Sequence, residues 1–229
     1  MDLRARALAI YRRLLDFYGY PEWRSPLPAI DELVSTILSQ NTNDTNRDRA
    51  FLALRSRFPT WETVRDAEPA EVVTAIRPAG LANQKGPRIQ AVLREITELR
   101  GDLNLDFLQE YSPEEARLWL LQFRGVGPKT AAIVLQFSLG MPAFPVDTHI
   151  YRVTGRLGLR PKKMNTEQAH EFLGELLPPE TYYPAHLNLI PLGREICQAR
   201  KPRCPVCPLQ DLCDYYAENF GGEADLNPA

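Results

Sequence analysis

The sequence predicts an all-α protein. Apolar residues recur at helical spacing along nearly the whole chain, for example in residues 31–40, 46–58, 69–77 and 87–101. No pair of segments has the alternating pattern and turn of a β-hairpin. With 229 residues, 44% of them hydrophobic, the chain can bury a sizeable core as one large domain or two small lobes. We expect about ten short helices joined by compact turns.

Two helix starts are marked by their own side chains. Ser112 and Glu115 have the spacing of a capping box, and Pro113 falls at the first helical position. Asn165 and Gln168 have the same spacing before an apolar segment. The sequence therefore predicts helices that begin directly after Ser112 and Asn165.

Composition excludes several classes of protein. Residues 1–20 are amphipathic and arginine-rich, without the apolar run of a signal peptide, and no stretch is apolar enough to span a membrane. We therefore expect a cytoplasmic protein with no membrane partner. The net charge is −2, but residues 204–229 hold five acidic and no basic residues, so the rest of the chain is weakly basic. Any contact with phosphate is expected to come from local clusters of charge.

All four cysteines lie within 17 residues, in the pattern C-x6-C-x2-C-x5-C: Cys197, Cys204, Cys207 and Cys213. Cysteines that serve only for packing would not collect in one proline-rich loop. Two disulfides would need an oxidising compartment, which nothing in the sequence indicates. Four thiolates suit a tetrahedral zinc or a 4Fe-4S cluster, and the spacing alone favours neither.

A basic cluster lies between the first two cysteines, formed by Arg200, Lys201 and Arg203. It is either a solvated face or, on a loop fixed by a metal, a rigid device for gripping a DNA phosphate. These three residues are therefore candidates for DNA binding.

A glycine turn and a lysine form the next candidate site. Gly125, Val126 and Gly127 separate two apolar helices, and such a turn is either a plain corner or a place where backbone amides bind phosphate. Lys129 falls in the first turn of the second helix, where a positive charge is locally unfavourable. That position disfavours the ammonium form and so favours a nucleophilic amine.

Asp147 follows Lys129 by 18 residues and precedes another helical pattern. It reads either as the N-cap of that helix or as a functional carboxylate.

Three motifs in order resemble endonuclease III of the helix-hairpin-helix DNA glycosylase superfamily: LLQFRGVGPKTAAIVL, VDTHIYRVTGRL and CQARKPRCPVCPLQDLC. The resemblance runs from about residue 28 to residue 215. It implies two helical lobes: a six-helix barrel domain with the helix-hairpin-helix at residues 27–141, and a cluster domain formed by residues 1–26 and 142–229, with DNA in the cleft between them. It also implies that the four cysteines hold a 4Fe-4S cluster, that the hairpin grips phosphate, and that Lys129 and Asp147 are the catalytic pair.

The resemblance further assigns residues that contact an opened duplex. Gln40 or Asn41 would fill the gap left by a flipped base, with Asn41 preferred by spacing, and Leu81 would wedge into the opposite strand unless it is an ordinary core leucine. Adenine-mismatch glycosylases have a glutamate where this chain has Thr36. The chain also has Leu192 where the family usually has a histidine before Gly193 and Arg194.

We therefore expect a bifunctional DNA glycosylase and AP lyase that removes oxidised pyrimidines. Its partner would be double-stranded DNA with a damaged base or an abasic site, and it would act as a monomer associated with the nucleoid. A thymine-mismatch glycosylase and a non-catalytic helix-hairpin-helix DNA-binding protein remain as alternatives. Only the last has no use for Lys129 and Asp147 as a pair.

Overall fold

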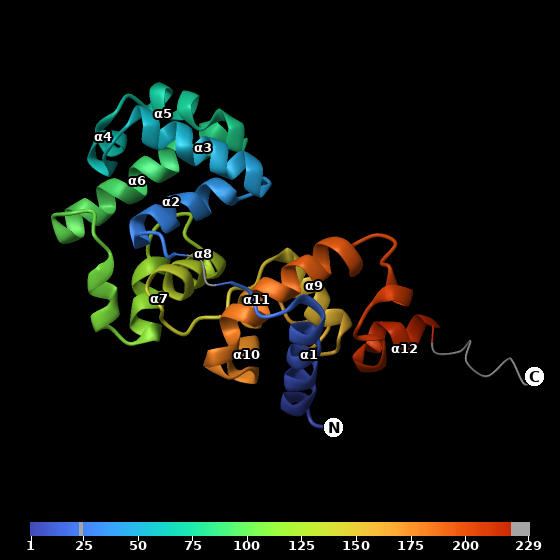
Figure 1. Cartoon of the computed structure of the whole chain (residues 1–229). Coiled ribbons are helices and arrows are strands. Elements are labelled where there is room, and N and C mark those ends of the chain that lie inside the picture. The colour runs from blue at the N-terminus through green and yellow to red at the C-terminus, as the bar shows by residue number, and fades with distance from the viewer. Residues whose placement is uncertain (23–24, 221–229) are drawn as a thin grey trace, which may run out of the picture. The chain divides into compact units, whose positions relative to one another are not determined.

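The computed structural model describes residues 1–22 and 25–220, which form helices joined by turns and loops (Figure 1). The described part contains twelve α-helices, short 3₁₀ and π segments, and no strand. The predicted all-α class is confirmed. Within the described ranges, no helix combines the length and apolarity that crossing a bilayer requires.

The chain divides into two compact units. The middle unit comprises Ser25–Met141, and the terminal unit comprises Met1–Arg24 and Pro142–Ala229. The assignment of residues 1–26, 27–141 and 142–229 to a cluster domain and a six-helix barrel domain stays a prediction, and its parts at 23–24 and 221–229 lie outside the described residues.

The middle unit is built around α2, Ala29–Ser39. Eight of its eleven residues are buried, and it contacts α3, α6 and α8. The other elements are α3 (Asp44–Arg57), α4 (Trp61–Asp66), α5 (Pro69–Ala75), η1 (Arg77–Ala79), α6 (Ala82–Arg100), η2 (Asp106–Glu110), α7 (Pro113–Leu121), α8 (Pro128–Ile133) and the π segment η3 (Val134–Ser138).

Helix starts in this unit follow the sequence where caps mark them. The Ser112–Glu115 capping box is present at the start of α7, as predicted. By contrast, α6 begins at Ala82, five residues before the predicted helical segment 87–101, so Pro87 lies inside the helix. Residues 82–86 carry no apolar pattern, because the inward side of this extra turn is formed by Lys85 and Gly86. Gly86 packs so closely on α5 that a Cβ there would lie 2.9 Å from a Val73 methyl.

The terminal unit joins segments from distant parts of the chain. Its elements are α1 (Leu3–Tyr18), α9 (Thr148–Arg156), α10 (Thr166–Leu176), η4 (Pro179–Thr181), α11 (Tyr182–Pro191), the π segment η5 (Leu192–Ile196), η6 (Cys204–Val206), η7 (Gln210–Leu212) and α12 (Asp214–Phe220). The predicted capping box of Asn165 and Gln168 starts α10.

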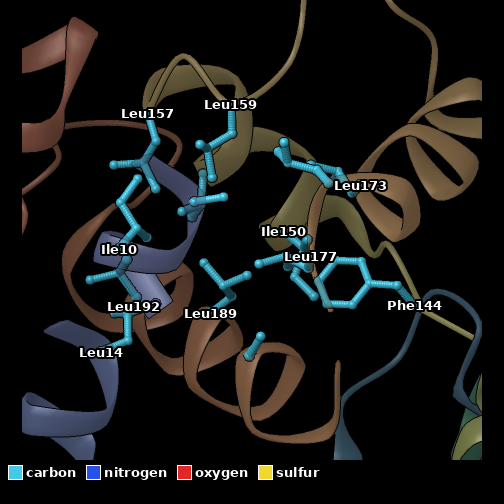
Figure 2. Close-up of a cluster of buried hydrophobic side chains, with 14 of the residues drawn as sticks. Ile10, Leu14, Phe144, Ile150, Leu157, Leu159, Leu173, Leu177, Leu189 and Leu192 are labelled. Atoms are coloured by element: carbon cyan, nitrogen blue, oxygen red, sulfur yellow. The ribbon is translucent and has the colours of Figure 1, made fainter. Parts of the chain in front are cut away.

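One apolar core holds this unit together (Figure 2). Ile10 and Leu14 of α1 point toward Leu192, and Leu189 of α11 lies in the same cluster as Ile150 of α9. Burying side chains of this size contributes about 1.5–3 kcal/mol each. The core therefore fixes α9, which carries Asp147 at its start, against the helix that leads to Cys197.

Candidate functional site

The glycine turn joins α7 to α8. Gly125 has φ +94°, a conformation that favours glycine, and a Cβ there would collide with the Arg88 side chain. Val126 is buried, and its N–H donates to the Phe123 carbonyl at 3.0 Å. Gly127 is extended and precedes Pro128, the first residue of α8. Apart from Gly127 itself and its two chain neighbours, no described residue has an atom within 4 Å of the position that a Gly127 Cβ would take, so the backbone there can approach a ligand closely.

Lys129 lies in the first turn of α8, as predicted, and is half-buried. That turn has no acidic residue, and no side chain caps it. The first N–H groups of a helix lack partners within the helix and carry its positive end. The start of α8 can therefore attract an anion, and it disfavours a second positive charge.

Asp147 caps α9. Its carboxylate accepts the N–H of Ile150 at 2.7 Å, and the residue is half-buried. The interpretation as an N-cap is thus correct, and it leaves a chemical role open, since a carboxylate has several acceptor positions. Lys129 belongs to the middle unit and Asp147 to the terminal unit.

All four cysteines line one pocket in the terminal unit. Its other lining residues are Val153, Arg156, Leu157, Leu192, Ile196, Gln210, Tyr215 and Tyr216. The four thiols are free of disulfides. Burial raises the pKa of Cys204 and Cys213, and that of Cys207 to about 11. Metal binding by cysteine requires the thiolate and therefore releases the thiol proton.

This donor set fits an iron-sulfur cluster. Four sulfur donors face an apolar pocket whose described lining includes no histidine or carboxylate. Among the described residues, no three His, Cys, Asp or Glu side chains gather closely enough to hold a single metal ion.

The basic loop between Cys197 and Cys204 is exposed, and its backbone is held by hydrogen bonds from α9. Arg152 donates to the Cys197 carbonyl at 3.0 Å, and Arg156 donates to the Gln198 carbonyl at 2.6 Å. The loop's cationic side chains all point into solvent: Arg200, Lys201 and Arg203. Two arginines of α9 therefore support the backbone that displays the predicted cluster.

The residues assigned to the opened duplex differ in their surroundings. Gln40 is engaged: its amide donates to the Gly125 carbonyl at 3.3 Å and its oxygen accepts from Arg88 at 2.8 Å. Asn41 is exposed and left-handed, with φ +53°. Leu81 is also left-handed, with φ +49°, and 47% exposed, so it is not a core leucine.

Sequence reasoning missed Lys85 and Arg88 of α6. Lys85 is 1% exposed, and its amine donates to the carbonyls of Leu38 and Ala79 at 2.7 and 2.8 Å. Burial, and then the charge of Arg88, lower the pKa of Lys85. A signal existed: Lys85 is in helical register with the buried Ile89 and Val92, which places a lysine on an apolar face.

Comparison with known proteins identifies this constellation. Residues 34–179 match the model of the HhH-GPD superfamily base excision DNA repair proteins, and residues 197–213 match the iron-sulfur binding domain of endonuclease III. A protein of Arabidopsis thaliana described as a DNA glycosylase is 37% identical over 195 residues, which cover 81% of this chain and 66% of that protein. Endonuclease III of Thermotoga maritima is 35% identical over 191 residues, covering 83% and 85%. The structure of a non-covalent endonuclease III–DNA complex matches with a TM-score of 0.81 at 25% identity, covering 95% of this chain and 98% of that one.

The chain belongs to the HhH-GPD superfamily of base excision DNA repair proteins. Within that superfamily it groups with endonuclease III, which confirms the predicted class of enzyme: a DNA glycosylase with the AP lyase activity typical of that family. The match to the iron-sulfur binding domain confirms an iron-sulfur centre, and the match to an endonuclease III–DNA complex confirms DNA binding.

Proposed function

We propose that this protein removes oxidised pyrimidines from double-stranded DNA and cleaves the abasic site by β-elimination. The observation that carries the proposal is Lys129, half-buried in the first turn of α8 directly after the glycine turn. A helix-hairpin-helix protein that only binds DNA has no use for Lys129 together with the carboxylate of Asp147, because a carboxylate does not attract phosphate.

The proposed reaction proceeds in two steps. The neutral Lys129 amine attacks C1′ of a flipped nucleotide, the C1′–N bond breaks, and the base leaves with the bonding electrons and takes up a proton. The attacking nitrogen then loses a proton, the C1′–O4′ bond breaks, and O4′ takes up a proton, which opens the sugar and leaves a Schiff base between C1′ and Lys129. Loss of a C2′ proton breaks the C3′–O bond and releases the 3′ phosphate.

Asp147 is proposed as the carboxylate that stabilises positive charge on the sugar and handles protons. An ionised carboxylate serves both purposes, and the cap bond to Ile150 holds this one in a fixed orientation. Because of this bond, the position of the Asp147 carboxylate depends on the position of α9.

The iron-sulfur centre is proposed to be a 4Fe-4S cluster held by Cys197, Cys204, Cys207 and Cys213. The proposal is supported by four sulfur donors that line one pocket and by the match of residues 197–213 to the iron-sulfur binding domain of endonuclease III. When bound, the cluster supplies a structural crosslink and no chemistry to the base. The chain's own contribution is the loop of Arg200, Lys201 and Arg203, which is proposed to contact DNA phosphate.

Asn41 is proposed to fill the gap left by the flipped base, and Leu81 to enter the opposite strand. Gln40 is already hydrogen-bonded to Arg88 and Gly125. Asn41 and Leu81 are instead exposed and have strained backbone conformations, which are common at functional sites. The protein is further proposed to act as a cytoplasmic, nucleoid-associated monomer.

Borohydride trapping tests the proposal. The protein is incubated with a duplex containing one oxidised pyrimidine, with an undamaged duplex, and with a duplex containing a thymine-guanine mismatch. A covalent adduct on the first duplex alone is the expected result. Adduct on the mismatch alone would assign a thymine-mismatch glycosylase, and binding without any adduct or base release would assign a non-catalytic protein.

A further inference from the structure

Two side chains of α6 reach the backbone or side chains of three separate segments of the middle unit. Lys85 and Arg88 are three residues apart, so they lie on neighbouring positions of the same helix face. The segments that they contact are those on which the proposed function relies: residues 38–41, residues 79–81 and the glycine turn.

Lys85 joins the first two of these segments. Its amine donates to the Leu38 carbonyl, in the last turn of α2 and three residues before Asn41, and to the Ala79 carbonyl, two residues before Leu81. The side chain is 1% exposed, so both carbonyls depend on a donor that water does not readily replace. Burial lowers the pKa of Lys85, yet both the ammonium and the neutral amine have enough hydrogens for these two bonds.

Arg88 joins the first segment to the third. Its guanidinium donates to the Gln40 side chain at 2.8 Å, and Gln40 donates to the Gly125 carbonyl at 3.3 Å. The Arg88 side chain also fills the space over Gly125 that a Cβ would occupy. Residues 38–41 are thereby tied to the glycine turn by the Gln40 side chain, which Arg88 holds in place.

Asn41 and Leu81, which these contacts hold in place, have strained backbone conformations. Asn41 and Leu81 both have positive φ, and non-glycine residues keep such conformations only where the surrounding structure imposes them. Around Leu81, the amides of Gln84 and Lys85 donate to its carbonyl at 2.9 and 3.0 Å, so the first turn of α6 begins at Leu81 itself. The buried Lys85 amine anchors that turn to α2.

We propose that Lys85 and Arg88 are positioning residues, which hold Asn41, Leu81 and the glycine turn in the one arrangement that extrudes a base from the duplex. This inference rests on the proposed function, because it assigns Asn41 and Leu81 to the opened duplex. Neither residue takes part in bond making or breaking. Their loss therefore affects base extrusion more than the chemistry that follows.

The test compares two lesions in single-turnover assays. One duplex has the damaged pyrimidine correctly paired, and the other has it opposite a mismatched base, where extrusion costs less. Lys85→Met, which keeps length but removes the donors, is expected to lower the rate on the paired lesion at least about tenfold more than on the mispaired one. An equal loss on both lesions would overturn the proposal.

Gln90→Leu is the matched control. Gln90 is also 1% exposed and on α6, and its amide donates to the carbonyls of Val64 and Ala67, far from the three segments in sequence. Removing it also leaves buried carbonyls without a donor. The ratio of the two rates is expected to stay at the wild-type value, and a shift like that of Lys85→Met would show that the ratio reports only lost stability.

Arg88 provides a second variant that does not open the core. Arg88 is half-buried, so Arg88→Leu is expected to fold even if Lys85→Met does not. It should shift the same ratio, and Arg88→Lys, which keeps one donor for Gln40, should partly restore it. Folded Arg88→Leu protein with a wild-type ratio would contradict the proposal.

A binding measurement separates this inference from the proposed function. A duplex with a stable abasic analogue opposite 2-aminopurine reports insertion into the stack by fluorescence and needs no catalysis. Wild-type protein and Gln90→Leu are expected to change the signal, and Lys85→Met is expected to change it much less at saturating protein. If wild-type protein releases no base from any duplex, the proposed function fails, while this signal still decides the positioning role.

Discussion

The Asp147 carboxylate accepts the backbone N–H of Ile150 at 2.7 Å, so one side chain both starts α9 and is proposed for chemistry. Asparagine makes the same cap bond, whereas alanine does not. The two roles can therefore be separated by choice of substitution.

Asp147→Asn is expected to slow base removal by roughly 100-fold or more, because it removes the negative charge, while changing the free energy of unfolding by less than about 0.5 kcal/mol. Single-turnover base release and urea denaturation measure the two effects. Asn165→Ala, which removes the cap of α10 in the same unit, should show the reverse: a loss of about 1 kcal/mol with an unchanged rate. A wild-type rate for Asp147→Asn would refute the chemical role.

Lys129→Gln is expected to abolish both strand nicking and borohydride trapping, because the amide cannot form a Schiff base. DNA affinity should stay within about threefold of wild type, since the helix start and the glycine turn still attract phosphate. Gel-based trapping and a binding titration test both statements. Adduct formation by Lys129→Gln would mean that another amine is the nucleophile.

Neutralising the basic loop by Arg200→Gln, Lys201→Gln and Arg203→Gln is expected to weaken binding to all DNA sequences alike. Each lost phosphate contact should reduce the slope of log affinity against log salt by about 0.9. Titrations at several salt concentrations measure that slope. Lys163→Gln, an exposed lysine elsewhere in the terminal unit, should leave it unchanged. A change of sequence preference would mean that the loop reads bases.

Leu81→Gly is expected to slow base removal at least about tenfold while leaving stability unchanged or raising it by up to about 1 kcal/mol. Glycine adopts the left-handed conformation of Leu81 without strain, but it has no side chain to enter the duplex. Thermal unfolding and single-turnover kinetics are the two measurements. Leu52→Ala, which truncates a leucine 68% exposed in the same unit, should leave the rate unchanged.

Purified protein is expected to contain about four iron and four sulfide per chain, because four thiols line one pocket and their segment matches the iron-sulfur binding domain of endonuclease III. Iron and sulfide analysis after iron-replete, anaerobic preparation measures this. A colourless protein with stoichiometric zinc would contradict the 4Fe-4S assignment. Removal of the metal should destabilise the basic loop and weaken DNA binding.

The sequence was most informative where structure is set locally. The caps at Ser112 and Asn165 and the conformation of Gly125 follow from spacing and residue type, so they could be predicted. The start of α6 could not. Its first turn is stabilised by Lys85, whose partners Leu38 and Ala79 are fixed only by tertiary packing.

In the candidate site, too, features set by local spacing could be predicted and features set by tertiary packing could not. The cysteine spacing indicated a metal centre, and the structure brings all four thiols to one pocket. The resemblance assigned Leu81 to the opposite strand, but residue type alone favours a core position for a leucine, and nothing local predicts its left-handed backbone conformation. The engagement of Gln40 depends on Arg88, 48 residues away, and no local pattern carries that information.

The shared core of α1 and α11 sets an order on biosynthesis. Helix α1 leaves the ribosome before its partners in that core, which include Leu189 and Leu192 and follow more than 160 residues later. At about 5–20 residues per second, α1 waits roughly ten seconds or longer without its partners. The middle unit is continuous in sequence and can complete its core during that interval. The four cysteines emerge after the middle unit, so the iron-sulfur centre can be inserted only into a chain whose middle unit has already had time to fold.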